Sequence, residues 1–110
     1  MESGGPDSRP RVRYEAAISS DILASYAADA AREVDGVLGV VESALHRHKG
    51  VRLINDDEGL KVELHLILQW GASIPTVGLA VQNRVSEYLG RMADIHPARI
   101  DVVIDLIGPP

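Results

Sequence analysis

The sequence predicts an α+β fold, a two-layer sandwich in which two helices pack on one face of a mixed four- to five-stranded sheet. Residues 60–70 alternate between apolar and mostly polar side chains, which is the period of a strand with one buried face. Apolar residues then recur at three- and four-residue spacing over residues 77–92, which is the period of an amphipathic helix. A similar stripe over residues 21–34 predicts the other helix.

The strand at residues 60–69 has two chemically different faces, and this difference sets the expected orientation of the sheet. One face is apolar and is predicted to lie against the helices: Leu60, Val62, Leu64, Leu66, Leu68 and Trp70. The opposite face is mostly polar and is predicted to form the outer face of the sheet: Lys61, Glu63, His65, Ile67 and Gln69.

Helix boundaries follow from capping residues. Ser73 can cap a helix in which Pro75 occupies the first turn, where a missing N–H is tolerated. Its inward stripe is predicted to be Val77, Val81, Val85, Tyr88 and Met92. Ser19 or Ser20 can cap the first helix, and Gly36 ends it. The inward residues of that helix are predicted to be Ile22, Leu23, Tyr26, Ala27, Ala30 and Val34.

Further strands are expected on both sides of these helices. A short strand is predicted at residues 13–18, and strands at 37–44, 51–54 and 60–69 are predicted to form a meander. The last strand, at residues 100–107, follows a helix and should therefore run parallel to the strand at 60–69 through a right-handed crossover. Strict alternation there predicts an inward set of Ile100, Val102, Ile104 and Leu106 and an outward set of Asp101, Val103, Asp105 and Ile107.

Length and composition predict one domain at residues 12–108 after a disordered tail at residues 1–11. The chain has no cysteine, no apolar leader and no run long enough to span a membrane, so a cytoplasmic location is expected. Its net charge is −5; the first thirteen residues carry +1, which leaves −6 on the body. An acidic body repels phosphate backbones, so a nucleic-acid partner is not expected.

No catalytic, cofactor-binding or metal-binding residues are predicted. The serines lack a nucleophile elbow, and His46 with His48 supplies only two neighbouring metal ligands. The segment from Gly36 to Gly39 matches the Gly-x-x-Gly of KH domains, which bind nucleic acid. Acidic residues precede this segment, which disfavours binding to a phosphate backbone. A KH-like RNA-binding module is therefore kept only as an alternative interpretation, and a small regulatory subunit of an enzyme is another.

Two surfaces are candidates for protein interaction. Apolar residues on the outer sheet face can form an interface when they are contiguous and surrounded by charge; the candidates are Ile67, Val103 and Ile107. A basic hairpin at residues 46–52 could dock electrostatically to an acidic partner or an anionic membrane; its cations are Arg47, Lys49 and Arg52.

An ordered series of segments resembles the alkaline shock protein family, the envelope-stress-response proteins of Gram-positive-type bacteria. The series begins with the Ile18–Leu23 and Ala31–Val37 segments, continues through Lys49–Val51 and Leu60–Leu64, and ends with Ile100–Ile104. Its most specific element is Trp-Gly-Ala-Ser-Ile-Pro at residues 70–75, although Trp70 replaces the smaller aromatic that is more usual there. The basic residues at 46–49 also depart from the family pattern.

The resemblance implies a non-enzymatic cytoplasmic scaffold or adaptor of the cell-envelope stress response. Such a protein self-associates and is held near the inner face of the membrane by a small membrane-anchoring partner. The family has no catalytic residues to transfer to this chain, and no cofactor is implied.

Overall fold

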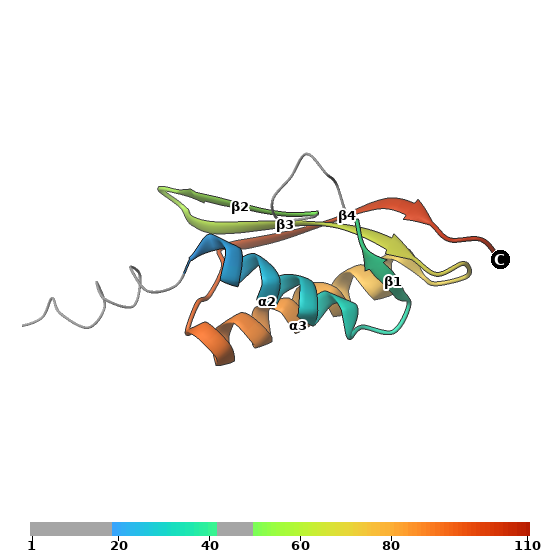
Figure 1. The fold of residues 1–110 in the computed structure, drawn as a ribbon, viewed down its shortest axis with the longest axis horizontal. Helices are drawn as coiled ribbons and strands as arrows, with labels where there is room; N and C mark the ends of the chain where they lie inside the picture. The colour runs from blue at the N-terminus through green and yellow to red at the C-terminus, as the bar shows by residue number, and fades with distance from the viewer. Residues whose placement is uncertain (1–18, 42–49) are drawn as a thin grey trace, which may run out of the picture.

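The computed structural model describes residues 19–41 and 50–110 and contains two layers (Figure 1). Helices α2 (Ser20–Arg32) and α3 (Ile74–Ala93) pack against each other and cover one face of the sheet. The sheet consists of β1 (Val37–Val40), β2 (Val51–Asp56), β3 (Gly59–Leu68) and β4 (Arg99–Ile107). The predicted α+β sandwich is confirmed, and the strand predicted at residues 13–18 lies outside the described residues.

Strand β3 is the centre of the sheet because all three other strands pair with it. Strand β4 runs parallel to β3, from the pair Lys61–Arg99 to the pair Leu68–Ile107, as the strand–helix–strand order predicts. Strands β1 and β2 are both antiparallel to β3. The sheet is therefore mixed.

The predicted meander is wrong in one connection, since β1 does not pair with β2. Both strands lie end to end along the same edge of β3, because β4 occupies the other edge. The N–H of Val41 donates to the carbonyl of His65 at 2.9 Å, and the N–H of His65 donates to the carbonyl of Gly50 at 2.8 Å. Strand β3, with ten residues, is long enough to pair with both short strands. Val41 and Gly50 therefore meet the same residue of β3, at the junction between the two short strands.

The core lies between β3 and the two helices. The predicted inward face of β3 is confirmed: Val62, Leu64, Leu66 and Leu68 are all fully buried. Strand β3 ends at Leu68, so Trp70 lies beyond the strand in a turn and is 65% exposed. The alternation of apolar and polar residues in the sequence therefore extends two residues beyond the end of β3, and the prediction that Trp70 faces inward is wrong.

Both helices begin where the capping residues predict. The hydroxyl of Ser19 accepts the N–H of Ile22 at 3.2 Å, and that of Ser73 accepts the N–H of Thr76 at 3.4 Å. The predicted inward stripes need two corrections, because Ile22 and Met92 lie at the solvent-facing margins of their helices and are exposed. The last buried residue of the apolar stripe on α3 is instead Leu89, which is fully buried.

Strand β4 contains a β-bulge that shifts its alternation. Leu66 pairs with Ile104, but the next residue of β3, Ile67, pairs with Leu106 rather than with Asp105. One extra residue in β4 therefore exchanges the faces of the residues that follow it. Leu106 lies beside the outward Ile67, and Ile107 lies beside the inward Leu68. The predicted faces of Leu106 and Ile107 are accordingly wrong.

Candidate interaction surfaces

The outer face of the sheet is divided into a charged part and an apolar part. In the charged part, Arg52, Glu63 and Asp101 lie side by side on three strands. Their neighbours form ion pairs: Lys61 contacts Asp56 at 3.0 Å and Glu58 at 2.7 Å, and Arg99 contacts Asp101 at 2.8 Å. These exposed pairs contribute little stability, but they keep this half of the face hydrated.

The apolar part of the outer face is centred on Ile67. Leu106 lies beside Ile67 on β4, and Gly39 lies beside it on β1. A Cβ on Gly39 would meet nothing within 4 Å, so the β1 side of Ile67 is open. Val103 lies two pairs away along the strands, beside His65, and its pair is the next one whose side chains lie on this face. Leu106 is 58% exposed and Val103 is 37% exposed. We call Ile67, Val103 and Leu106 the apolar outer patch.

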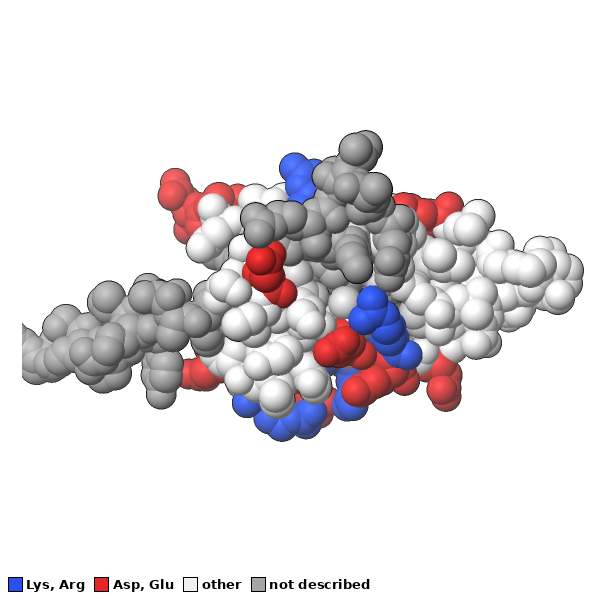
Figure 2. Space-filling view, viewed as in Figure 1, with Lys and Arg blue, Asp and Glu red and all other residues white. Residues whose placement is uncertain are grey.

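This patch differs from the predicted one in a single residue. Ile67 and Val103 lie on the outer face as alternation indicates, whereas Ile107 is replaced by Leu106 because of the bulge. Nothing in the local sequence marks the bulge, since apolar residues occupy every second position from Ile100 to Leu106. The patch borders an uncharged end of the molecule, which is white in Figure 2. No Lys, Arg, Asp or Glu occurs between Glu63 and Arg84 or after Asp105.

His65 lies between the charged part and the apolar outer patch and bridges two carboxylates. Its Nε2 lies 2.6 Å from Glu63 Oε2, and its Nδ1 lies 3.0 Å from Asp105 Oδ1. A neutral imidazole carries only one N–H, so it can donate to only one of the two carboxylates, whereas the imidazolium can donate to both. The hydrogen bond with Glu63, and next that with Asp105, raise the pKa of His65 above its usual value.

Replacing His65 with glutamine should reduce the dependence of stability on pH. A raised pKa in the folded state means that the His65 contribution is fully present below the unfolded-state pKa of about 6.5 and is lost as pH rises through the folded-state value. Because the group is partly exposed, we expect this contribution to be about 1 kcal/mol or less. From pH 6 to pH 9, the urea midpoint of unfolding should fall more for the wild type than for His65→Gln. Equal falls would contradict the bridge.

The arrangement around His65 does not extend to a catalytic or metal site. The described part of the chain has no Ser or Thr hydrogen-bonded to His65, and its two ring nitrogens are both engaged by carboxylates. Among these residues, no group of three or more His, Asp or Glu side chains is placed to hold a metal ion. His46 and His48 lie outside the described residues.

The predicted basic hairpin is described only at its end. Arg52 lies on β2 and is exposed on the outer face, directly opposite Glu63. Arg47 and Lys49 lie outside the described residues. The described strands on either side of this segment, β1 and β2, each pair with β3 and not with each other.

The Gly-x-x-Gly segment is not a loop. Gly36 has a positive φ of 96° before β1, whereas Val37 and Gly39 belong to β1 and pair with Leu68 and Ile67. A KH motif uses these four residues as an exposed loop that clamps the nucleic-acid backbone. The two residues between the glycines are in a paired strand here, so the KH interpretation loses its structural basis.

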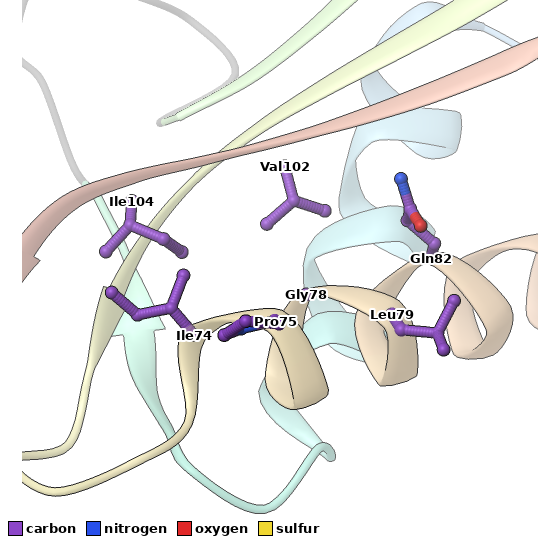
Figure 3. Close-up of a pocket in the computed structure, with 7 residues that line it drawn as sticks. All are labelled: Ile74, Pro75, Gly78, Leu79, Gln82, Val102 and Ile104. Carbon is purple, nitrogen blue, oxygen red and sulfur yellow. The ribbon is translucent and has the colours of Figure 1, made fainter.

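A groove between α3 and β4 is a further feature, and the sequence did not indicate it (Figure 3). It encloses about 260 Å³ and has no charged residue in its lining. The lining consists of Ile74, Pro75, Gly78, Leu79 and Gln82 from α3 with Val102 and Ile104 from β4. Leu79 is 59% exposed and Ile74 is 44% exposed. Gln82 Nε2 donates to the carbonyl of Ile100 at 2.9 Å.

These features define a small two-layer α+β domain with an apolar outer patch and an uncharged groove at one strand. The chain belongs to the alkaline shock protein family, described as having a cell envelope-related function, whose model matches residues 9–108. The resemblance seen in the sequence is therefore confirmed. A relative from Bacillus subtilis (strain 168), the uncharacterized protein YqhY, is 30% identical over 97 residues, covering 79% of this chain and 72% of the relative.

Several solved structures share the fold at low sequence identity. A double variant of the MamM CTD has a TM-score of 0.58 at 15% identity, covering 81% of this chain and 84% of that one. The copper form of the MamM CTD has a TM-score of 0.55 at 17% identity, covering 79% and 85%. At these identities the likeness shows the fold alone.

No helix in the described ranges, 19–41 and 50–110, has the length and apolar character needed to cross a membrane.

Proposed function

We propose that this chain is a non-enzymatic cytoplasmic scaffold or adaptor of the cell-envelope stress response. It self-associates through the apolar outer patch and docks to a membrane-anchored partner at the inner face of the membrane. Membership of a family with a cell envelope-related function supports this proposal. The absence of a catalytic arrangement around His65, in the part of the chain that the structure describes, is compatible with it.

The observation that carries the proposal is that Ile67 and Leu106 are paired, with Val103 two pairs away, on the sheet face opposite the helices. Contiguous exposed apolar residues bordered by charge are typical of protein–protein interfaces. The ion pairs of the charged part and the bridged His65 border this patch on one side. A second copy can bury the patch while the charged part remains in water, which is the usual arrangement of an interface core and its rim.

Replacing Ile67 with aspartate should dissociate the self-associated form and leave the domain folded. Burying an unpaired carboxylate in an interface costs several kcal/mol, which corresponds to a loss of about a hundredfold or more in the association constant. Sedimentation velocity should show a smaller species, and the far-ultraviolet circular dichroism should be unchanged.

Ile54→Asp is a matched control because it makes the same chemical change on the same sheet face. Ile54 lies opposite Lys61, in the charged part, where a carboxylate remains hydrated. We expect Ile54→Asp to associate like the wild type. A wild type that is monomeric at high micromolar concentration, or equal effects of the two variants, would refute self-association through the apolar outer patch.

A further inference from the structure

We propose that the free edge of β4, together with the groove between β4 and α3, binds an extended peptide segment of a partner. The segment would add as a strand beside β4, with aliphatic side chains directed into the groove and basic side chains on the outer face. This inference rests on the proposed adaptor role and assigns a surface for partner docking that is separate from the apolar outer patch.

The first support is the unpaired edge of β4. In the described part of the chain, β4 pairs with β3 only. Gln82, which lies outside the sheet, donates to the carbonyl of Ile100, so Ile100 directs its main-chain groups away from β3. Successive residues of a strand direct these groups to alternate edges, and Val102 and Ile104 therefore present theirs on the free edge. An exposed edge of this kind can pair with a further strand.

The second support is the size and chemistry of the groove. Its volume of about 260 Å³ lies below the range of about 300–1,000 Å³ that is usual for small-molecule sites, and it suits one or two side chains. Its lining is aliphatic apart from Gln82, which is already hydrogen-bonded to Ile100. Figure 3 shows Val102 and Ile104 pointing from β4 toward α3. A segment paired with β4 would direct every second side chain to this same face.

The third support is charge. On the outer face, β4 presents Asp101 and Asp105, and the whole chain carries a net charge of −5. Asp101 is paired with Arg99, and Asp105 with His65, yet opposite charges that face each other on neighbouring strands still attract. Lysine or arginine is therefore favoured at the outward positions of the added segment, and aspartate or glutamate is disfavoured.

A second copy of β4 fits this edge less well than a short peptide. If two β4 strands paired antiparallel about Val102, Ile100 of each copy would lie opposite Ile104 of the other. In each copy, however, the Gln82 side chain occupies the carbonyl of Ile100. The bulge after Ile104 also ends the regular part of the edge. A peptide needs to pair only at Val102 and Ile104, and the peptide itself has no such obstruction.

The test uses the full chain and a synthetic peptide in which lysine and valine alternate, with blocked termini and an attached fluorophore. A scrambled peptide of the same composition, with all the valines consecutive, controls for charge alone. We expect the alternating peptide to bind about tenfold or more tightly than the scrambled one in fluorescence anisotropy, because only alternation places valine in the groove and lysine outside. Equal binding of the two peptides would overturn the proposal.

The Gly78→Leu variant tests the location. Gly78 lines the groove, and a Cβ at this position would meet nothing within 4 Å, so the leucine side chain can occupy the groove without displacing the core. Leucine also has a higher helix propensity than glycine, so the variant should remain folded. We expect its affinity for the alternating peptide to fall by about tenfold or more, because the occupied groove excludes the peptide valines.

Asn83→Leu is the control for Gly78→Leu, because it adds leucine to an exposed position of α3 that is not in the groove lining. It should bind the peptide like the wild type. Unchanged peptide affinity in Gly78→Leu would overturn the proposal. A change in self-association caused by Gly78→Leu would also overturn it, because the groove would then hold a second copy. Failure of Ile67→Asp to alter association concerns the apolar outer patch only, so the two results are distinguishable.

Discussion

Replacing Gly50 with alanine is expected to destabilise the domain by about 3 kcal/mol or more. Gly50 has a φ of 90°, which a residue with a side chain rarely adopts. An added Cβ would also overlap the carbonyl oxygen of Val41 and lie 2.9 Å from Cγ1 of Val40. The backbone oxygen cannot move aside without disturbing the hydrogen bonds that Val41 and Gly50 make with His65. Urea unfolding followed by circular dichroism measures the loss.

Gly71→Ala separates the two causes. Gly71 has a similar φ of 85°, but a Cβ there would meet nothing within 4 Å. We expect this variant to lose only the cost of the left-handed backbone, about 1–2 kcal/mol. The difference between the two variants then measures the overlap at Val41. Equal losses would show that Val41 and Gly50 are not in close contact in solution.

Truncating Leu66 and Leu106 to alanine should have very different effects, and the contrast tests the bulge in β4. Leu66 is fully buried between the sheet and the helices, so Leu66→Ala should cost about 2–5 kcal/mol. Leu106 lies on the outer face and is 58% exposed, so Leu106→Ala should change the stability of the monomer by about 0.5 kcal/mol or less. Thermal unfolding at a concentration where the protein is monomeric measures both.

The contrast has a clear contradicting outcome. Uninterrupted alternation along β4 would place Leu106 inward, and its truncation would then cost as much as that of Leu66. A loss of several kcal/mol in Leu106→Ala would therefore contradict the observed register, in which Ile67 pairs with Leu106. It would also remove Leu106 from the apolar outer patch and restore Ile107, the residue that alternation predicts.

Much of the fold could be predicted because it depends on local patterns of apolar residues and on capping residues. The inward face of β3, from Val62 to Leu68, follows directly from alternation, and the caps at Ser19 and Ser73 follow from their side-chain oxygens. The strand–helix–strand order also predicts that β4 runs parallel to β3. These features depend on residues within one or two elements.

The remaining features depend on which elements meet in space. Apolar residues occupy every second position of β4 from Ile100 to Leu106, so the bulge leaves no trace in this pattern and the exchange of Leu106 for Ile107 could not be foreseen. The predicted pairing of β1 with β2 is wrong because it depended on which strands meet in space. The ten-residue length of β3 allows both β1 and β2 to lie along one of its edges. The groove depends on the spacing between α3 and β4, which no local pattern specifies.

The shared edge of β1 and β2 has a consequence for how this fold can diversify. Val41 and Gly50 both hydrogen-bond to one residue, His65, so the sheet determines where the intervening segment begins and ends but places no requirement on its length. Closing a loop twice as long costs only about 0.6 kcal/mol. A longer segment could therefore be inserted at this position while the strand register is kept. This position is a natural insertion point at which recognition can evolve independently of folding.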